Sequence, residues 1–284
     1  MKLSKIFALL LALCLISSAA CAAPFTDAHG NVIELDDSLE AYAAVTLVGA
    51  DNAARQGETN LGDLWADALR WFAVSGEINA AFDEDDVKAG NDRIAVDADH
   101  VVALWNGGNL RADIAEGTFG AEALAEVLPF PNKVAVVYMT GAQLLETLEA
   151  ASQGLPYTAE TADACASLMQ VSGLTYTVDT TKAYDALEAY GDHWFTAGSV
   201  SRVRIDDVNG QPFDAEATYA VVTSNANFNG MDSSYVLKAA AEANEQSAVT
   251  TAVVRDVVFR FIASELNNQV GEAYAAPQGR LTVL

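Results

Sequence analysis

Short apolar segments alternate along this chain with longer segments of helical periodicity, and this alternation restricts the folds it can adopt. HVVALW (100–105) is typical of a short buried strand and runs directly into Asn106-Gly107-Gly108. KVAVVYM (133–139) and TYAVVTS (218–224) favour strands for the same reason, and Asn209-Gly210 is typical of a hairpin turn. Further strands are predicted over residues 41–50, 173–179, 202–208 and 279–284.

Other segments have apolar residues at helical spacing. Residues 60–73 predict a helix with Asn60 as its N-cap, and a short helix is predicted over 120–127. Thr140, with Gln143 three residues later, forms the pattern of a capping box at the start of another helix. Residues 247–268 predict a long helix. Strands and helices are mixed, and many strands are expected to pair locally. The pattern favours an α+β or layered fold over a doubly wound sheet.

The N-terminus has the composition of a signal peptide, because a basic start precedes an apolar core over 7–16 that is too short to span a bilayer. Two processing routes remain open: cleavage after Ala22, or lipid attachment at Cys21 within SAAC, which resembles a bacterial lipobox. No second apolar run reaches transmembrane length. We expect an exported protein that is periplasmic, on the cell surface or secreted. The predicted organisation is a signal peptide (1–22), a lead-in segment (23–42) and one domain (43–284).

Charge and cysteine content narrow the function further. The chain has 39 acidic and 15 basic residues and a formal net charge of −24, which argues against nucleic acid as a partner because its phosphates would be repelled. An anionic ligand would need a local basic site. Only Cys165 belongs clearly to the mature chain, so no internal disulfide framework is expected. Stability must come from a hydrophobic core, which this length allows.

Motifs for catalysis by this chain alone are missing. Asp27-Ala28-His29 has the D-x-H shape that opens a metallophosphoesterase site, but the additional ligands that two-metal hydrolysis needs do not follow. We therefore interpret His29 as a turn residue facing solvent. The chain contains no G-x-S-x-G elbow, no G-x-x-x-x-G-K and no G-x-G-x-x-G.

Two arginines stand next to candidate binding elements. Arg55 precedes the predicted helix at Asn60, and Arg111 follows the glycine turn. A guanidinium beside such a turn can hold a carboxylate, a phosphate or a ribose hydroxyl. The residue types alone favour the other interpretation, an internal salt bridge.

Longer motifs carry a resemblance to a known family. RQGETNLGDLWADALR (55–70) resembles the R-x-x-E-x-x-L-G-N-L-x-A-D-A segment of the 5′-nucleotidase C-terminal domain family. Residues 105–149 are similar to its N-G-G-G-I-R … V-L-P-F-x-N … L-T-G-x-x-L block. MQVSGLTYTVD (169–179) and APQGRLTV resemble two later motifs, so the similarity extends over about residues 43 to 284.

The resemblance implies an α+β domain with α/β/β/α layers that carries substrate specificity. Arg55, Asn106 and Arg111 would lie around the phosphate and ribose of a nucleotide, and the glycines would let the backbone approach the ligand. Phe130 would stack on the base. The family normally places two divalent metals and the hydrolysis in an N-terminal metallophosphoesterase domain, so no cofactor is expected in this chain. The substrate-binding residues that the resemblance assigns are Arg55, Asn106, Gly108, Arg111, Phe130 and Asp232.

This sequence departs from the family pattern in two places. SNANFNGMDSSY (224–235) keeps Asp232, but Ala226 stands at the position of the second aromatic residue and Met231 interrupts the expected G-G-D-G. Phe228 is either a substitute for the lost ring or a core residue. The second departure is that the segment before residue 43 is too short to hold the catalytic domain.

Three hypotheses follow. The first is an exported domain that binds a nucleoside or nucleotide in nucleotide catabolism or scavenging, and that acts either with a separate metallophosphoesterase chain as its catalytic partner or as a binding module. The alternative is a degenerate domain that serves as an interaction or structural protein of the cell envelope. Autonomous phosphatase activity is the least favoured, because metal ligands are missing from the sequence pattern. The family is one of hydrolases, and whether this chain is itself an enzyme is left open.

Overall fold

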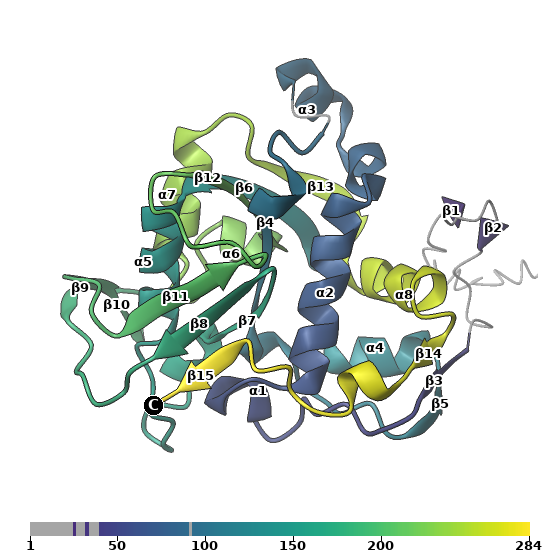
Figure 1. The fold of residues 1–284 in the computed structure, drawn as a ribbon, viewed down its shortest axis with the longest axis horizontal. Helices are drawn as coiled ribbons and strands as arrows, with labels where there is room; N and C mark the ends of the chain where they lie inside the picture. Colours follow the sequence, from purple (N-terminus) through teal and green to yellow (C-terminus); the bar gives the residue numbers. More distant parts are fainter. Residues whose placement is uncertain (1–24, 27–31, 34–39, 91–92) are drawn as a thin grey trace, which may run out of the picture.

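A five-stranded mixed sheet forms the centre of the fold (Figure 1). The computed structural model describes residues 25–26, 32–33, 40–90 and 93–284. The sheet has the order β13-β6-β12-β4-β7; β4 and β12 run parallel, and the other neighbours pair antiparallel. The strands are β4 (Val101–Asn106), β6 (Lys133–Thr140), β7 (Met169–Ser172), β12 (Thr218–Ser224) and β13 (Ala248–Val253).

Both faces of the sheet are buried along β4, β6 and β12, which explains why these strands are largely apolar runs. Along β4, Val101, Ala103 and Trp105 belong to one core cluster, and Val102 and Leu104 belong to the other. The first cluster lies under the helices α2 (Asn60–Val74), α4 (Ala121–Val127) and α8 (Val254–Ser264).

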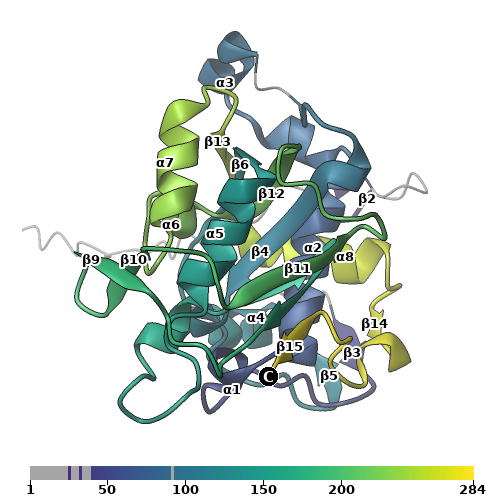
Figure 2. The same cartoon turned by 60° about the vertical axis from the view of Figure 1, so that its left-hand side comes forward.

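The second cluster lies between the central sheet and a mixed layer of strands and helices (Figures 1 and 2). This layer contains a three-stranded sheet of order β11-β8-β15 together with two helices. Its members are β8 (Leu174–Val178), β11 (Val203–Val208), β15 (Leu281–Val283), α5 (Gly141–Ala151) and α7 (Tyr235–Ala243). The α+β class predicted from the sequence is confirmed.

Smaller elements complete the fold. One further sheet has the order β14-β3-β5, and a separate hairpin pairs β9 with β10. The short strands are β1 (Phe25–Thr26), β2 (Val32–Ile33), β3 (Ala41–Ala43), β5 (Gly117–Phe119), β9 (Ala186–Tyr190), β10 (Trp194–Ala197) and β14 (Gln269–Val270). The short helices are α1 (Ala53–Gln56), α3 (Glu84–Ala89) and α6 (Asn225–Phe228). The 3₁₀ turns are η1 (Glu77–Ala81), η2 (Ala98–His100), η3 (Gly107–Asn109), η4 (Ala164–Ser167) and η5 (Glu272–Tyr274).

Several local predictions are confirmed. The Thr140 hydroxyl and the Gln143 side chain form the predicted capping box of α5. Asn209 and Gly210 both have positive φ and close a tight turn between Val208 and Gln211. The strand before this turn pairs with β8.

The long helix predicted over 247–268 is wrong in its first part. Residues 248–253 form β13, and α8 begins at Val254. The segment is rich in β-branched residues, and it completes the edge of the central sheet by pairing with β6. The strand predicted over 41–50 is shorter than expected: Ala41–Ala43 forms β3, and beyond it Leu47 makes an isolated bridge with Ile114.

The predicted N-cap of α2 is displaced by one residue. Thr59 is the N-cap, and its hydroxyl accepts a hydrogen bond from the Gly62 amide. Asn60 instead fixes tertiary structure: its amide group donates to the Thr46 and Tyr274 carbonyls, and its side-chain oxygen accepts from the Val48 amide.

Acidic side chains near the start of α2 hold the segment that leads into β15. The Glu58 carboxylate accepts hydrogen bonds from the Gln278 and Leu281 amides at 2.8 and 3.0 Å. Arg280 lies 2.8 Å from Asp67 and 3.8 Å from Asp63. Burial, the neighbouring Glu58 charge and a hydrogen bond to the Glu58 side chain raise the pKa of Asp63 to about 8. Asp63 is therefore protonated at neutral pH.

This carboxyl group makes stability depend on pH. The folded pKa of Asp63 is about 8 and its ordinary value is 3.8, so between these pH values the folded state holds a proton that the unfolded state lacks. The stability that this proton gives is complete below about pH 4 and is lost as the pH rises through about 8. Asp63→Asn keeps a neutral polar group and removes the titration.

We expect the free energy of unfolding to fall less for Asp63→Asn than for the wild type between about pH 6 and pH 9. Urea denaturation at several pH values measures this difference. Glu188→Gln, which changes an exposed carboxylate on β9, should follow the wild-type curve. Parallel curves for wild type and Asp63→Asn would contradict the assignment.

Candidate functional site

The central sheet brings three chain segments together at one of its edges. The parallel strands β4 and β12 both end there, at Asn106 and Ser224, and the antiparallel β6 begins there at Lys133. Asn106 is the last residue of β4, a strand that is buried along its length, and it starts a chain of hydrogen bonds. The Asn106 side-chain nitrogen Nδ2 donates to Asp232 Oδ2 at 2.8 Å, and the Asn106 side-chain oxygen accepts from Asn109 Nδ2 at 2.9 Å.

The glycines after Asn106 pack against the protein itself. A Cβ on Gly107 would stand 2.0 Å from the Ala54 carbonyl oxygen, and one on Gly108 would stand 2.7 Å from the Ala166 Cβ. Both lie inside the closest approach of real Cβ atoms. The family resemblance predicts that these glycines let a ligand approach the backbone. In the structure, both positions lack a side chain because neighbouring protein atoms occupy the space that a Cβ would need. Gly108 also lines the cavity described below.

Arg111 and Phe130 form an exposed pair. The Arg111 amide donates to the Val127 carbonyl at 3.0 Å, and the Arg111 guanidinium carbon lies 5.8 Å from the centre of the Phe130 ring. Phe130 is 44% exposed, although it is a large apolar side chain. No carboxylate in the described part of the chain forms an ion pair with Arg111. The internal salt bridge favoured by residue types is therefore not observed for Arg111.

Asp232 reaches the same place from the loop after α6. Its φ of 56° lies in the left-handed region that aspartate tolerates better than most residues. Burial raises its pKa, and the charge of Arg55, the hydrogen bond from Asn106 and the charge of Arg111 oppose that rise. The carboxyl group is thus held among polar and basic groups, in a position suited to hydrogen bonding with ligand hydroxyls.

These side chains line one cavity of about 460 Å³. Five of the six site residues predicted from the family resemblance are among its walls: Asn106, Gly108, Arg111, Phe130 and Asp232. Two more wall residues, Ala226 and Met231, are those at which segment 224–235 departs from the family pattern. The remaining wall residues were not assigned a role from the sequence: Asn109, Pro131, Asn132, Ala166 and Asn225.

Arg55 does not line this cavity. Its guanidinium donates to the Ala162 carbonyl at 2.9 Å and lies 3.9 Å from Asp163. For Arg55 the internal interaction expected from residue types is therefore observed. Its charge still acts on Asp232, so Arg55 contributes to the electrostatics behind the cavity wall.

Phe228 does not replace the missing aromatic residue. It packs against the second core cluster, whereas Ala226 lies on the cavity wall. Among the residues that line the cavity, Phe130 is the one aromatic side chain.

An unpredicted hairpin supports two walls of the cavity. Strands β9 and β10 project from the body of the fold (Figure 2). The Tyr190 hydroxyl donates to the Gly230 carbonyl at 2.7 Å, directly beside Met231. The Trp194 indole donates to the Ala164 carbonyl at 3.2 Å, close to Ala166. The hairpin thereby links the loop that carries Asp232 to the 3₁₀ turn η4 on the opposite wall of the cavity.

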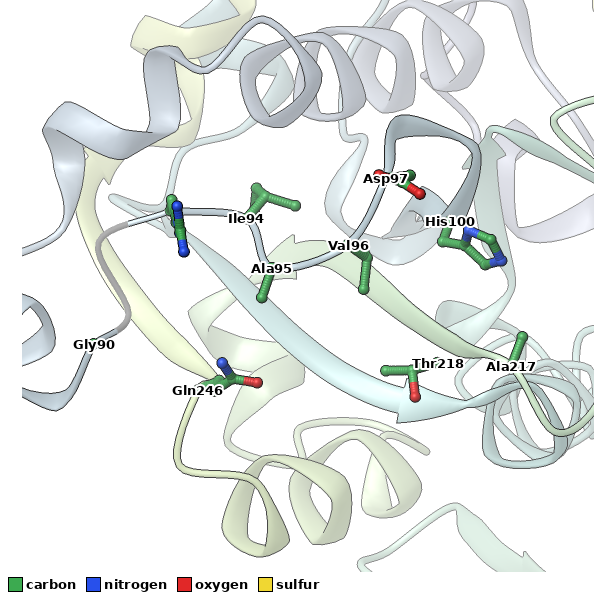
Figure 3. A pocket seen from close by; sticks show the side chains of 10 residues that line it. Gly90, Ile94, Ala95, Val96, Asp97, His100, Ala217, Thr218 and Gln246 are labelled. Atoms are coloured by element: carbon green, nitrogen blue, oxygen red, sulfur yellow. The ribbon is translucent and has the colours of Figure 1, made fainter.

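A second cavity, of about 660 Å³, lies near the opposite ends of β4 and β12. Figure 3 shows the extended segment that contains Ile94 to Asp97 along one side of it, with Thr218 and Gln246 on the other. Arg93 and His100 are its basic side chains. It is the larger of the two cavities, but it lacks an aromatic platform and the hydrogen-bonded Asn106–Asp232 pair. The smaller cavity is therefore the better candidate for recognition of a specific ligand.

The described residues show neither a cluster of metal-binding side chains nor a membrane-spanning helix. Within residues 40–90 and 93–284, no group of three or more His, Cys, Asp or Glu side chains is placed to hold a metal ion. In the same part of the chain, no helix has the length and apolar character of a membrane span. Asp27, His29 and Cys21, and the predicted signal peptide, lie outside the described residues.

Comparison with known proteins identifies the family. The sequence profile described as 5′-nucleotidase, C-terminal domain, matches residues 40–239, a range that contains all six predicted site residues. The chain belongs to this family. A 5′-nucleotidase precursor from Thermus thermophilus has a similar structure, with a TM-score of 0.61 and 30% identity over 86% of this chain and 39% of that one.

Two other proteins extend the comparison. The trifunctional nucleotide phosphoesterase protein YfkN of Bacillus subtilis (strain 168) is 28% identical over 188 residues, 65% of this chain and 10% of that protein. The Haemophilus influenzae NAD nucleotidase shares the fold, with a TM-score of 0.58 at 14% identity over 92% of this chain and 48% of that one. This member of the 5′-nucleotidase C-terminal domain family thus spans less than half the length of each of these relatives.

The close packing of Gly107 predicts that adding one methyl group at this position strongly lowers the stability of the fold. Gly107→Ala places a Cβ against the Ala54 backbone, which cannot move aside as a flexible side chain can. We expect the free energy of unfolding to fall by about 1–3 kcal/mol. Gly57→Ala is the matched control, because its Cβ would meet nothing within 4 Å, and it should stay within about 0.5 kcal/mol of the wild type. Equal stability of the two variants in urea denaturation would contradict this account.

Proposed function

We propose that this chain binds a nucleoside or nucleotide in the cavity between Asn106, Arg111, Phe130 and Asp232, and that it acts in nucleotide catabolism or scavenging. The observation that carries the proposal is the meeting of five family-motif residues around one cavity. The cavity volume of about 460 Å³ lies in the range usual for small-molecule sites.

The chemistry of the walls supports this class of ligand. The exposed Phe130 ring offers a face on which a heteroaromatic base can stack. Asp232 and Asn106 offer a carboxylate and an amide to ribose hydroxyls. The Arg111 guanidinium, which forms no ion pair in the described part of the chain, offers two parallel N–H groups to a phosphate. In a chain with a net charge of −24, such a local basic group is needed to hold an anion.

The family resemblance extends the proposal to partners and location. Hydrolysis, with its pair of divalent metals, would belong to a metallophosphoesterase domain or chain distinct from residues 40–284, and this domain would supply substrate specificity. The signal-like N-terminus supports export, with or without a lipid at Cys21.

Calorimetric titration of residues 24–284 with adenosine and AMP tests the proposal. Saturable binding is expected, and Arg111→Ala should weaken AMP binding at least about tenfold because a charge-assisted contact is lost. Arg93→Ala, which removes the arginine of the second cavity, is the matched control and should bind as the wild type does. An unchanged affinity for Arg111→Ala would exclude the assigned pocket.

The base-stacking role of Phe130 makes a separate prediction. Phe130→Ala should lose about 1–3 kcal/mol of binding free energy for adenosine, and Phe130→Tyr should keep most of it. Phe195 on β10 is also 44% exposed and does not line the cavity, so Phe195→Ala controls for the loss of any exposed ring. If Phe130→Ala and Phe195→Ala bind adenosine with the same affinity, the proposal that the base stacks on Phe130 is wrong.

Absence of binding for every nucleoside and nucleotide would favour the alternative hypothesis. The loss of an aromatic side chain at Ala226 would then mark a domain kept for its fold, as an interaction or structural protein. Thermal denaturation with and without ligand gives an independent measurement, because a ligand that binds only the folded state raises its stability.

A further inference from the structure

Met231 differs from the other methionines that the structure describes. Met139 and Met169 are core residues with exposed fractions of 3% and 1%, whereas Met231 is 59% exposed and lines the candidate cavity. A large apolar side chain that is mostly exposed on the wall of a cavity contributes little to packing inside the fold. Its position instead adds apolar surface to the site that already contains the exposed Phe130.

The backbone that presents Met231 is fixed on both sides. Gly230 and Asp232 both have positive φ, 85° and 56°. The Met231 amide donates to the Ala226 carbonyl at 3.0 Å, and its own carbonyl accepts from the Ser234 amide at 3.1 Å. Tyr190 holds Gly230 through a 2.7 Å hydrogen bond. The loop therefore sets where the side chain begins, while the unbranched thioether keeps its own rotational freedom.

We propose that Met231 is a specificity-determining residue, which forms with Phe130 the apolar surfaces that hold the base of the bound nucleoside. This inference rests on the proposed function. The family pattern places a second aromatic ring at the position of Ala226, whose methyl group is too small to cover a base. Met231, which lies beside Ala226 on the cavity wall, supplies this apolar contact instead. Thioethers make favourable contacts with aromatic rings and adapt to irregular shapes. A side chain that adapts in this way can contact purine and pyrimidine bases alike.

The first test compares three substitutions by calorimetric titration with adenosine and uridine. Met231→Ala should weaken binding of both about five- to tenfold, and Met231→Leu should stay within about threefold of the wild type because it keeps apolar volume. Met231→Phe should favour adenosine over uridine, since a second ring stacks over more of the larger base. Val200→Ala, at a residue that is exposed and does not line the cavity, is the control.

The second test uses a peroxide as a probe of the same side chain. Hydrogen peroxide transfers one oxygen atom to the Met231 sulfur: the O–O bond breaks, an S–O bond forms and water leaves, so the sulfur is oxidised by two electrons and the peroxide is reduced. Peptide mass spectrometry should find the sulfoxide at Met231 before Met139 and Met169. Saturating adenosine should slow the reaction at Met231, and the oxidised protein should bind adenosine more weakly.

The outcomes separate the two proposals. If the wild type binds nucleosides but Met231→Ala binds them equally well, or adenosine gives Met231 no protection, the role of Met231 is wrong and the proposed function stands. If the wild type binds no nucleoside or nucleotide, both proposals fail. Circular dichroism of Met231→Ala and Met231→Leu confirms that each variant is folded before its affinity is interpreted.

Discussion

The burial of the central sheet on both faces is the constraint on which the rest of the structure depends. Alternate residues of β4 enter two different cores, so the interior of the strand can carry no side chain for recognition. Polar side chains that can meet a ligand lie where the strands end, whereas those inside the sheet, such as Gln170 and Thr250, are buried and hydrogen-bonded within the protein. The parallel pairing of β4 with β12 brings two such ends to one edge, and the start of β6 lies beside them. The candidate site occupies that edge because the topology leaves it there.

The sequence predicted well those features that depend on nearby residues. The capping box at Thr140, the turn at Asn209-Gly210 and the buried strands are all local patterns. Most site residues were predicted through a family resemblance, which contains tertiary information that periodicity lacks. Asn106 and Asp232 are 126 positions apart, and nothing in the residues between them reports their contact.

The sequence predictions that proved wrong all concern features that depend on contacts between distant segments of the chain. The segment 248–253 is a strand because the edge of β6 needs a partner, and this tertiary pairing outweighs the apolar periodicity that resembles a helix. The tight packing of Gly107 against Ala54 depends on a contact between distant segments. Arg55 and Arg111 are chemically alike in the sequence, yet one contacts Ala162 and Asp163 and the other lies over Phe130. Their different surroundings, which only the fold creates, give them different tasks.

The anchoring of residues 278–281 on Glu58 has a consequence for biosynthesis. The hydrogen bond from the Leu281 amide to Glu58 joins residues 223 positions apart. A ribosome makes the chain from its N-terminus, so Glu58 lacks its two backbone partners until residues 278–281 have been made. The last native contacts of the domain therefore form late, after synthesis of the central sheet. Until then, α2 is a helix whose contacts with the β15 segment are still missing.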